Sequence, residues 1–265
     1  MKTTTPCAVL ALLIFSQTLC SSAVNVPAGV NNDSYDRLLK KYVDQNGLVA
    51  YGKWKENAED RKALTTYLEQ FAAGDSNASG NERYASLINA YNALVIDWIL
   101  QNYPAESIWA LKDSFKARRH KVGSATVSLN DIENSALRPE FGYRTHAVLV
   151  CAARSCPPLQ RSAYSSGQLE EQVEHGYRTW LSRSDLNELF PDKNEAEISS
   201  IFKWFKGDFE KAGGVKAILV KYVPAPAKPL LQKPDCQITY KTYNWGLNDQ
   251  GPHGRNWKQS VFDFL

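Results

Sequence analysis

The chain has 265 residues, of which 43% are hydrophobic and 22% are charged, a composition typical of globular proteins. Its formal net charge of +3 comes from 31 basic and 28 acidic residues, a balance that gives no reason to expect nucleic-acid binding. Five cysteines are too few for a scaffold held together mainly by disulfides. Composition therefore excludes wholesale disorder, collagen-like chains and long coiled coils.

The N-terminus reads MKTTTPCAVLALLIFSQTLCSSA, with one lysine, a short apolar run and then small residues. This pattern predicts a secretory signal peptide over residues 1–23, cleaved after Ala23. The apolar run is shorter than the roughly 20 residues that span a bilayer. The residues before Cys20 do not fit a lipoprotein signal, so we do not expect lipid anchoring there. We expect a secreted or periplasmic protein with one globular domain over residues 24–265 and no transmembrane segment after cleavage.

Apolar residues at helical spacing predict helices over residues 33–45, 56–73, 82–102, 128–137 (ending before Pro139), 168–181, 197–209 and 215–222. Short apolar or alternating runs predict strands over residues 48–51, 145–152 and 237–243, and a hairpin within 114–129 that turns at Gly123–Ser124. Pro224, Pro226 and Pro229 predict a loop. The helix over 82–102 is apolar nearly all round, which indicates a buried central helix. The predicted fold class is α+β, a single helix-rich domain around a small mixed or antiparallel sheet.

His146, Cys151 and Cys156 fall within eleven residues. Thiol chemistry requires a cysteine beside a base or a positive charge that lowers the pKa of its thiol. On a straight strand, His146 and Cys151 face opposite sides, whereas Cys156 follows a turn and can fold back. Three interpretations stay open: Cys156 is a nucleophile with His146 as general base, Cys151 and Cys156 form a disulfide, or the cysteines are small core residues.

Asn89 and Asn92 lie three residues apart on one face of the predicted central helix. A buried amide costs free energy unless it is hydrogen bonded. These side chains therefore either hold neighbouring loops or contribute to a site, where they would donate hydrogen bonds to a developing oxyanion. The carboxylates Asp131 and Glu133 are interpreted as charges at a helix N-terminus. No closely spaced ligand pair or phosphate-binding loop is present, so neither a metal nor a cofactor is expected.

Five blocks of the sequence occur in the order and spacing of the domain-of-unknown-function 547 family: LINAYNALVI (87–96), SLNDIE (128–133), HAVLVCAARSCPPL (146–159), IFKWFKGDF (201–209) and YNWGLND (243–249). The chain resembles this family, whose members include secreted bacterial proteins, over about residues 84–249. The resemblance implies characteristic positions at Asn89, Asn92, His146, Cys151, Cys156, Trp204, Asp208 and Asn248. The chain departs from the family at Asn130 and Asn134, where aspartate and histidine are usual.

A buried helix followed by a strand that bears a histidine also resembles the papain and transglutaminase architecture, at the level of fold alone. We therefore expect a thiol-dependent hydrolase or acyl transferase that acts on a peptide or a small molecule. Cys156 would be the nucleophile and His146 the general base, with Asn89 or Asn92 as oxyanion donor. The alternative is a non-catalytic envelope or extracellular binding protein with a structural disulfide between Cys151 and Cys156.

Overall fold

The computed structural model describes residues 24–72, 76–255 and 257, and the predicted signal peptide, with Cys7 and Cys20, lies outside them. The α-helices are α1 (Asp33–Tyr42), α2 (Tyr51–Glu56), α3 (Ala58–Glu69), α4 (Gly80–Asn102), α5 (Arg138–Phe141), α6 (Leu169–Leu181), α7 (Ile201–Trp204), α8 (Lys206–Glu210), α9 (Val215–Tyr222) and α10 (Lys228–Gln232). The strands are β1 (His120–Val122), β2 (Ala125–Val127), β3 (Glu188–Phe190), β4 (Glu195–Ile198) and β5 (Gln237–Tyr240). This architecture confirms the predicted α+β class.

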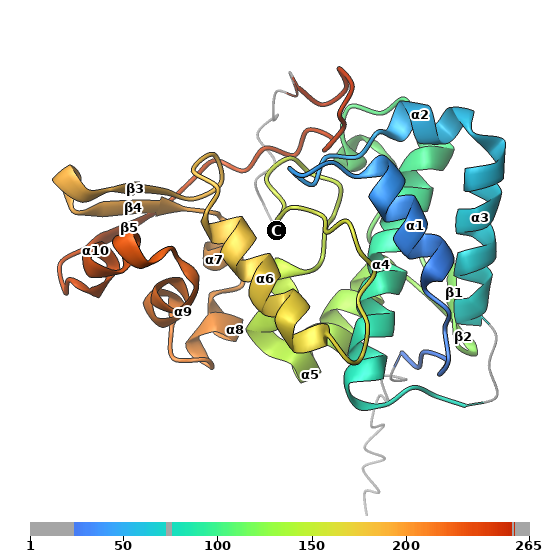
Figure 1. Ribbon diagram of the computed structural model, residues 1–265, viewed down its shortest axis with the longest axis horizontal. Helices are drawn as coiled ribbons and strands as arrows, with labels where there is room; N and C mark the ends of the chain where they lie inside the picture. The colour runs from blue at the N-terminus through green and yellow to red at the C-terminus, as the bar shows by residue number, and fades with distance from the viewer. Residues whose placement is uncertain (1–23, 73–75, 256, 258–265) are drawn as a thin grey trace, which may run out of the picture.

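The long helix α4 forms the centre of one region of the molecule. Its residues from Ala85 to Ile96 are buried on every side, which confirms the prediction of a central helix. Helices α2 and α3 pack against it, and Figure 1 shows α1, α2 and α3 gathered at the same end of the molecule. The aromatic pairs Tyr35–Tyr67 and Tyr42–Trp54 stack within this region, with ring centroids 4.7 Å and 4.6 Å apart. Burial of these large rings stabilises the helical layer.

A small mixed sheet forms the other region. Strand β3 pairs with β4 in antiparallel fashion, and β4 pairs with β5 in parallel, so that Ala196 lies between Leu189 and Ile238. Figure 1 shows this sheet, with α9 and α10 beside it, at the opposite end from α1 to α3, and α6 running between the two regions. Strands β1 and β2 form the predicted hairpin, in which Gly123 takes a positive φ of 57° at the turn.

The strand predicted over residues 145–152 is wrong. Residues Gly142–Ala147 form a 3-10 helix, and the chain then continues as a loop to Cys156. Between Val148 and Val150, the backbone of this loop is paired with a side chain instead of a neighbouring strand. Asn92 of α4 donates to the carbonyl of Val148 and accepts from the N–H of Val150, each at 2.9 Å. This apolar, β-branched segment does not form a strand, because the side-chain amide of Asn92 makes the hydrogen bonds that a neighbouring strand would otherwise make.

Two further predictions differ from the structure because tertiary pairing outweighs local spacing. The helix predicted over 197–209 begins as β4, which ends at Ile198, and then breaks into α7 and α8. Since β4 has a partner on each side, its residues are held in the extended form. The strand predicted over 48–51 reduces to bridges from Val49 to Val43 and to Asp249, and Tyr51 already begins α2.

Prolines stop the helices less strongly than the sequence suggests. Pro139 lies in the first turn of α5 and does not end the helical segment before it. The predicted loop at Pro224, Pro226 and Pro229 contains a 3-10 helix over Ala225–Ala227 followed by α10, each with a proline in its first turn. The first N–H groups of a helix have no intrahelical partner, so a proline leaves no hydrogen bond unmade there.

Candidate functional site

A cavity of about 550 Å³ lies between the two regions and receives side chains from distant parts of the chain. Its walls include Tyr91, Trp109, Asn130, Glu133, Arg138, His146, Leu149, Cys151, Cys156, Trp204, Phe205, Tyr243 and Trp245. The structure thus brings together three residues singled out from the sequence, His146, Cys151 and Cys156. Asn89 and Asn92 do not line this cavity.

The two cysteines meet at one side of the cavity. The Sγ atoms of Cys151 and Cys156 lie 2.8 Å apart, which is longer than the roughly 2.05 Å of a disulfide, and both cysteines are free. The N–H of Cys151 and the hydroxyl of Tyr243 both donate to Cys156 Sγ, each at 3.2 Å. Cys156 is only 4% exposed, whereas Cys151 is partly exposed. These contacts direct hydrogen-bond donors at the Cys156 sulfur.

A left-handed residue between the cysteines creates their contact. Ala152 has a φ of 62°, a conformation that costs a non-glycine residue about 1 kcal/mol or more. The carbonyl of Ala152 accepts from the N–H of Asn248 at 2.9 Å, and the N–H of Arg154 donates to Gly246 at 2.8 Å. The segment that follows Tyr243 therefore holds the loop in a turn that carries the two sulfurs to the same place.

The hydrogen bonds give the two thiols opposite properties. Burial works to raise the pKa of Cys156, but hydrogen bonds from Cys151, Tyr243 and the backbone outweigh burial and place that pKa below its usual value. The hydrogen bond to Cys156, together with burial, raises the pKa of Cys151 well above its usual value. Of the two thiols, Cys156 is therefore the one that loses its proton more readily.

His146 belongs to a second polar group in the same cavity. Its Nε2 lies 2.9 Å from Oδ2 of Asp208, and Nε of Arg138 donates to the same oxygen at 2.8 Å. The imidazole stacks on Phe205, with ring centroids 4.3 Å apart. The hydrogen bonds from His146 and then Arg138 hold the pKa of Asp208 well below its usual range. Burial lowers the pKa of His146 in spite of Asp208, so the imidazole is neutral at physiological pH.

The base and the nucleophile are not in contact. Among the described residues, His146 makes no hydrogen bond to Cys151 or Cys156, and its Nδ1 has no hydrogen-bond partner. Because Nε2 faces Asp208, Nδ1 is the nitrogen left for proton transfer in the cavity. The sequence placed the histidine and the thiols near one another but gave no sign of Asp208 as the partner that orients the ring.

Glu133 is the site residue whose position differs most from the sequence interpretation. Asp131 does serve the helix start, since its carboxylate accepts from the N–H of Ser128 and pairs with Arg118, at 2.9 Å each. Glu133 instead lines the cavity and accepts a hydrogen bond from the hydroxyl of Tyr91 at 3.2 Å. Burial raises the pKa of its carboxyl.

A π-helix sets the direction of the Glu133 side chain. Residues Asp131–Leu137 form this element, and π-helical turns recur at functional sites. Asn130, Glu133 and Arg138 all line the cavity from this segment and the helix that follows it. Their spacing of three and five residues was the signal that the sequence offered for a polar face on this element.

Aromatic rings make up much of the remaining wall. Trp204, Tyr243 and Trp245 are in mutual contact, with ring centroids between 4.5 Å and 5.7 Å apart. Trp109 meets Trp245 edge-on at 5.1 Å and is 43% exposed, which makes it the rim of the cavity. Lys112 also lines the rim and is exposed. The cavity thus offers an apolar, aromatic surface with a few polar groups, as ligand-binding cavities do.

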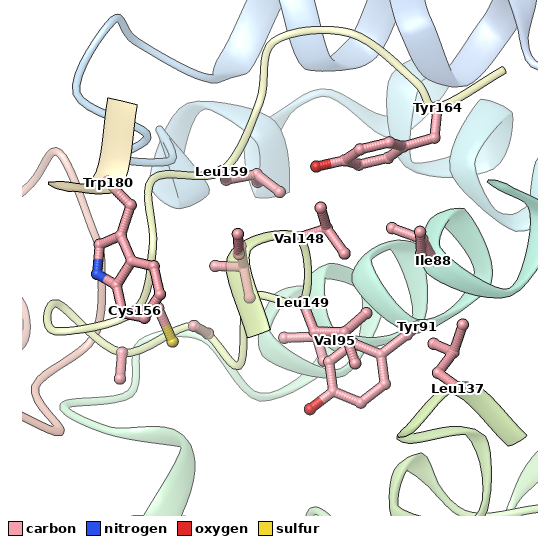
Figure 2. Close-up of a cluster of buried hydrophobic side chains, with 14 of the residues drawn as sticks. Ile88, Tyr91, Val95, Leu137, Val148, Leu149, Cys156, Leu159, Tyr164 and Trp180 are labelled. Atoms are coloured by element: carbon pink, nitrogen blue, oxygen red, sulfur yellow. The ribbon is translucent and has the colours of Figure 1, made fainter. Parts of the chain in front are cut away.

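The asparagines of α4 are engaged elsewhere. Asn89 is 1% exposed; its amide donates to the carbonyl of Tyr164 at 2.8 Å and accepts from the N–H of Tyr164 at 2.9 Å. Asn92 holds the loop that leads to Cys151 in the same two-sided way. Figure 2 shows Ile88 and Tyr91, from the same helix, in one buried cluster with residues of that loop and Cys156. The asparagines thus fix loops on α4, and their polar atoms are bonded to backbone.

Neither a membrane span nor a metal site is found in the described part of the chain. Among residues 24–72, 76–255 and 257, no helix has the length and apolar character needed to cross a membrane. Over the same residues, no three side chains of histidine, cysteine, aspartate or glutamate are grouped to hold a metal ion.

Comparison with known proteins identifies a family for the part of the chain that contains most of this site. The sequence model of the family described as "Protein of unknown function, DUF547" matches residues 76–181. The resemblance to this family seen in the sequence is therefore confirmed over that stretch. His146, both cavity cysteines and Glu133 lie within it, whereas Trp204, Asp208 and Tyr243 lie beyond it. No curated protein and no solved structure matches the chain.

Proposed function

We propose that this protein is a thiol-dependent hydrolase or acyl transferase that acts on a small molecule or a peptide bound in the cavity. The observation that carries the proposal is the set of donors on Cys156: the Cys151 N–H and the Tyr243 hydroxyl both point at its sulfur, on the wall of a cavity of about 550 Å³. A thiolate stabilised in this way is the reactive form of cysteine.

In the proposed reaction, the Cys156 thiolate attacks the carbonyl carbon of an ester, thioester or amide. The new bond joins sulfur to carbon, and the bond to the leaving group breaks. As the thiolate forms, Nδ1 of His146 takes the Cys156 proton through water and then gives it to the leaving group. The imidazole, neutral again, later takes a proton from the water or acceptor that releases the acyl group and returns it to Cys156. Asp208 supports this role because it fixes the imidazole through Nε2 and leaves Nδ1 to the cavity.

We assign the stabilisation of the oxyanion to Glu133 instead of the asparagines. The side-chain amides of Asn89 and Asn92 are hydrogen bonded to the backbone of loops. A carboxyl group whose pKa is raised by burial stays protonated to higher pH and donates a hydrogen bond through its O–H. Glu133 lines the cavity and is itself positioned by Tyr91. In its protonated form, Glu133 is therefore the donor that we assign to a developing negative charge.

The walls favour a substrate with an apolar or aromatic acyl group. The surface formed by Trp204, Tyr243 and Trp245 is suited to a flat, apolar group. Lys112 and Lys116 are exposed at the rim and form no ion pair in the part of the chain that the structure describes. These two cations favour a substrate that carries an acidic group at its outer end.

The proposal is tested with p-nitrophenyl esters of aromatic and aliphatic acids. The reduced protein should release a burst of nitrophenolate of one equivalent per chain, and digestion should find the acyl group on Cys156. Aromatic acyl groups should react faster than acetyl, because they bind the wall. A protein without a burst, or one acylated at Cys236 as readily as at Cys156, would refute the proposal.

A second candidate is favoured by a separate observation. The sulfurs of Cys151 and Cys156 lie 2.8 Å apart, and a secreted or periplasmic location would place them in an oxidising compartment. In that case the protein is a non-catalytic extracellular or envelope binding protein with a structural disulfide. Thiol counting on the protein purified without reductant separates the two candidates. A stable disulfide that resists mild reductant supports the binding protein, and two free cavity thiols support the enzyme.

A further inference from the structure

The cavity holds two thiols, although acyl transfer requires one. Cys151 lies 2.8 Å from the Cys156 sulfur, also lines the cavity and is the more exposed of the two. Its own sulfur has one further neighbour, the hydroxyl of Tyr243 at 3.8 Å. A thiol that retains its proton directly beside a stabilised thiolate has the arrangement of a resolving cysteine.

We propose that Cys156 and Cys151 carry out thiol–disulfide exchange with a low-molecular-weight disulfide that enters the cavity. Cys156 is the attacking thiol and Cys151 the resolving thiol. This inference rests on the proposed function only in that both use Cys156 as nucleophile. It goes further because it requires Cys151 as a reacting thiol, whereas in acyl transfer Cys151 only stabilises the Cys156 thiolate through hydrogen bonds.

The exchange balances in two steps. The Cys156 thiolate attacks one sulfur of the entering disulfide, a mixed disulfide forms, and the other half leaves as a thiolate. Cys151 then loses its proton, to His146 or to water, and attacks Cys156 Sγ. The second half leaves as a thiol or thiolate, and the Cys151–Cys156 disulfide remains. The entering disulfide is reduced by two electrons, and the protein dithiol is oxidised by the same two.

The geometry suits the second step because little movement is needed. The two sulfurs must approach by less than about 1 Å to reach the length of a disulfide bond. Asn92 and Asn248 hold the backbone on either side of Cys151, so the disulfide between Cys151 and Cys156 can form without rearrangement of the loop.

The burial of Cys156 limits the partner. Cys156 is 4% exposed and is reached through a cavity of about 550 Å³, so its sulfur is open to a small disulfide and closed to one on the surface of another folded protein. An aromatic disulfide with carboxylates matches the aromatic wall and the rim lysines.

Exchange also has a consequence for the acyl-transfer reaction. Oxidation places the Cys156 sulfur in a disulfide, where it cannot act as a nucleophile. Each completed exchange should therefore abolish acyl transfer until a dithiol reductant restores the Cys156 thiol. The pair would thus make the enzyme sensitive to oxidised thiols in its surroundings.

The test uses 5,5′-dithiobis(2-nitrobenzoate), an aromatic disulfide with two carboxylates. The chain carries Cys7→Ser, Cys20→Ser and Cys236→Ser, so that Cys151 and Cys156 are the remaining thiols. After reduction and removal of the reductant, we expect two thionitrobenzoate ions released per chain, no label on the protein, and an intact mass lower by two hydrogens. Peptide mapping of the natural sequence serves as the second measurement if the triple variant does not fold.

Two single variants in this background assign the roles. Cys151→Ser should release one thionitrobenzoate and keep one label on Cys156, because the mixed disulfide cannot be resolved. Cys156→Ser should react at least about tenfold more slowly, because burial still raises the pKa of the Cys151 thiol and this thiol lacks the backbone donors that stabilise the Cys156 thiolate. Two labels retained on the parent protein, or no release at all, would overturn the exchange mechanism.

The failure of exchange is distinguishable from the failure of the proposed function. Cys151→Ser keeps the backbone N–H and places a hydroxyl donor beside Cys156 Sγ, so the nitrophenyl-ester burst should keep its size of one equivalent while its rate changes. A burst without disulfide formation leaves acyl transfer standing and removes the exchange. Conversely, disulfide formation without a burst supports exchange and contradicts acyl transfer.

Discussion

Two sets of buried polar groups meet at the loop from Val148 to Cys156, and they differ in whether their hydrogen-bonding capacity is filled. On the α4 side, Asn89 and Asn92 each donate to and accept from a loop backbone. On the cavity side, His146 and Cys156 have shifted pKa values and face open space. The amides shape the loop. The groups available for chemistry are those that line the cavity, where Nδ1 of His146 has no partner among the described residues and Cys156 Sγ accepts hydrogen bonds that stabilise its thiolate.

The two sets also depend on each other. Asn92 fixes the backbone at Val148 and Val150, and the next residue is Cys151. The position of Cys151 against Cys156 therefore depends on an asparagine that does not line the cavity. Removal of a group from the cavity side should therefore change reactivity, whereas removal of an amide on the α4 side should change stability.

The largest effect is expected for Cys156→Ser. A serine hydroxyl has no stabilised anion at neutral pH, so kcat/KM for ester hydrolysis should fall by about a thousandfold or more. The free energy of unfolding should change by less than about 1 kcal/mol, because the two side chains are similar in size. Steady-state kinetics and urea denaturation measure the two quantities. Cys236→Ser, a buried cysteine outside the cavity, is the matched control and should leave both nearly unchanged.

Asn92→Ala should show the opposite pattern. The substitution leaves the Val148 carbonyl and the Val150 N–H without partners, and each such buried group costs about 1–3 kcal/mol. We expect the free energy of unfolding to fall by about 3 kcal/mol in urea denaturation. Gln101→Ala, an exposed amide on the same helix, should change it by less than about 0.5 kcal/mol. Unchanged stability in Asn92→Ala would break the distinction between the two sets.

Glu133 tests whether a neutral acid acts in the cavity. Glu133→Leu removes the donor and should lower kcat by about a hundredfold, whereas Glu133→Gln keeps a donor and should lose much less. The raised pKa also has a consequence for stability: the folded state binds the proton more tightly, so stability falls as pH rises from about 4.5 through the folded pKa. Glu133→Gln should remove that fall in denaturation curves recorded across pH. Equal rate losses in both variants would rule out a donor role.

The central helix, the hairpin and the thiol–histidine cluster could be predicted from the sequence, because each has a local signature. The 82–102 helix shows its apolar periodicity, and His146 lies ten residues from Cys156. The pairing of His146 with Asp208 spans 62 positions, and nothing local indicates it. The sequence predicts a strand over 145–152, but residues 148–151 form a loop because their hydrogen bonds come from Asn92, which lies 58 positions away from Val150. What escaped prediction is thus what long-range side-chain contacts create.

His120 is a buried polar group outside both sets. It shows that a ring nitrogen without a hydrogen-bond partner does not by itself indicate a reactive group. It lies in β1, away from the cavity wall, and its Nε2 has no hydrogen-bond partner among the described residues. Burial, with a contribution from Arg119, lowers its pKa to about 4. We do not expect a role in catalysis for it, because the ring does not line the cavity that contains the two thiols and His146. Unfilled capacity should therefore indicate chemistry only where it faces a cavity.

The expected effect of His120 is on acid stability. The unfolded chain binds the proton near pH 6.5 and the folded chain only near pH 4, so the folded state loses stability as pH falls through that interval. Between pH 7 and pH 5 the loss from this residue should be about 2 kcal/mol. His120→Phe should remove this part of the acid slope in denaturation experiments, while His175→Gln, at an exposed histidine of α6, should retain it. His120→Phe could instead keep the full dependence of stability on pH and slow ester hydrolysis. His120 would then belong with the reactive groups, and access to a cavity would no longer separate reactive from structural groups.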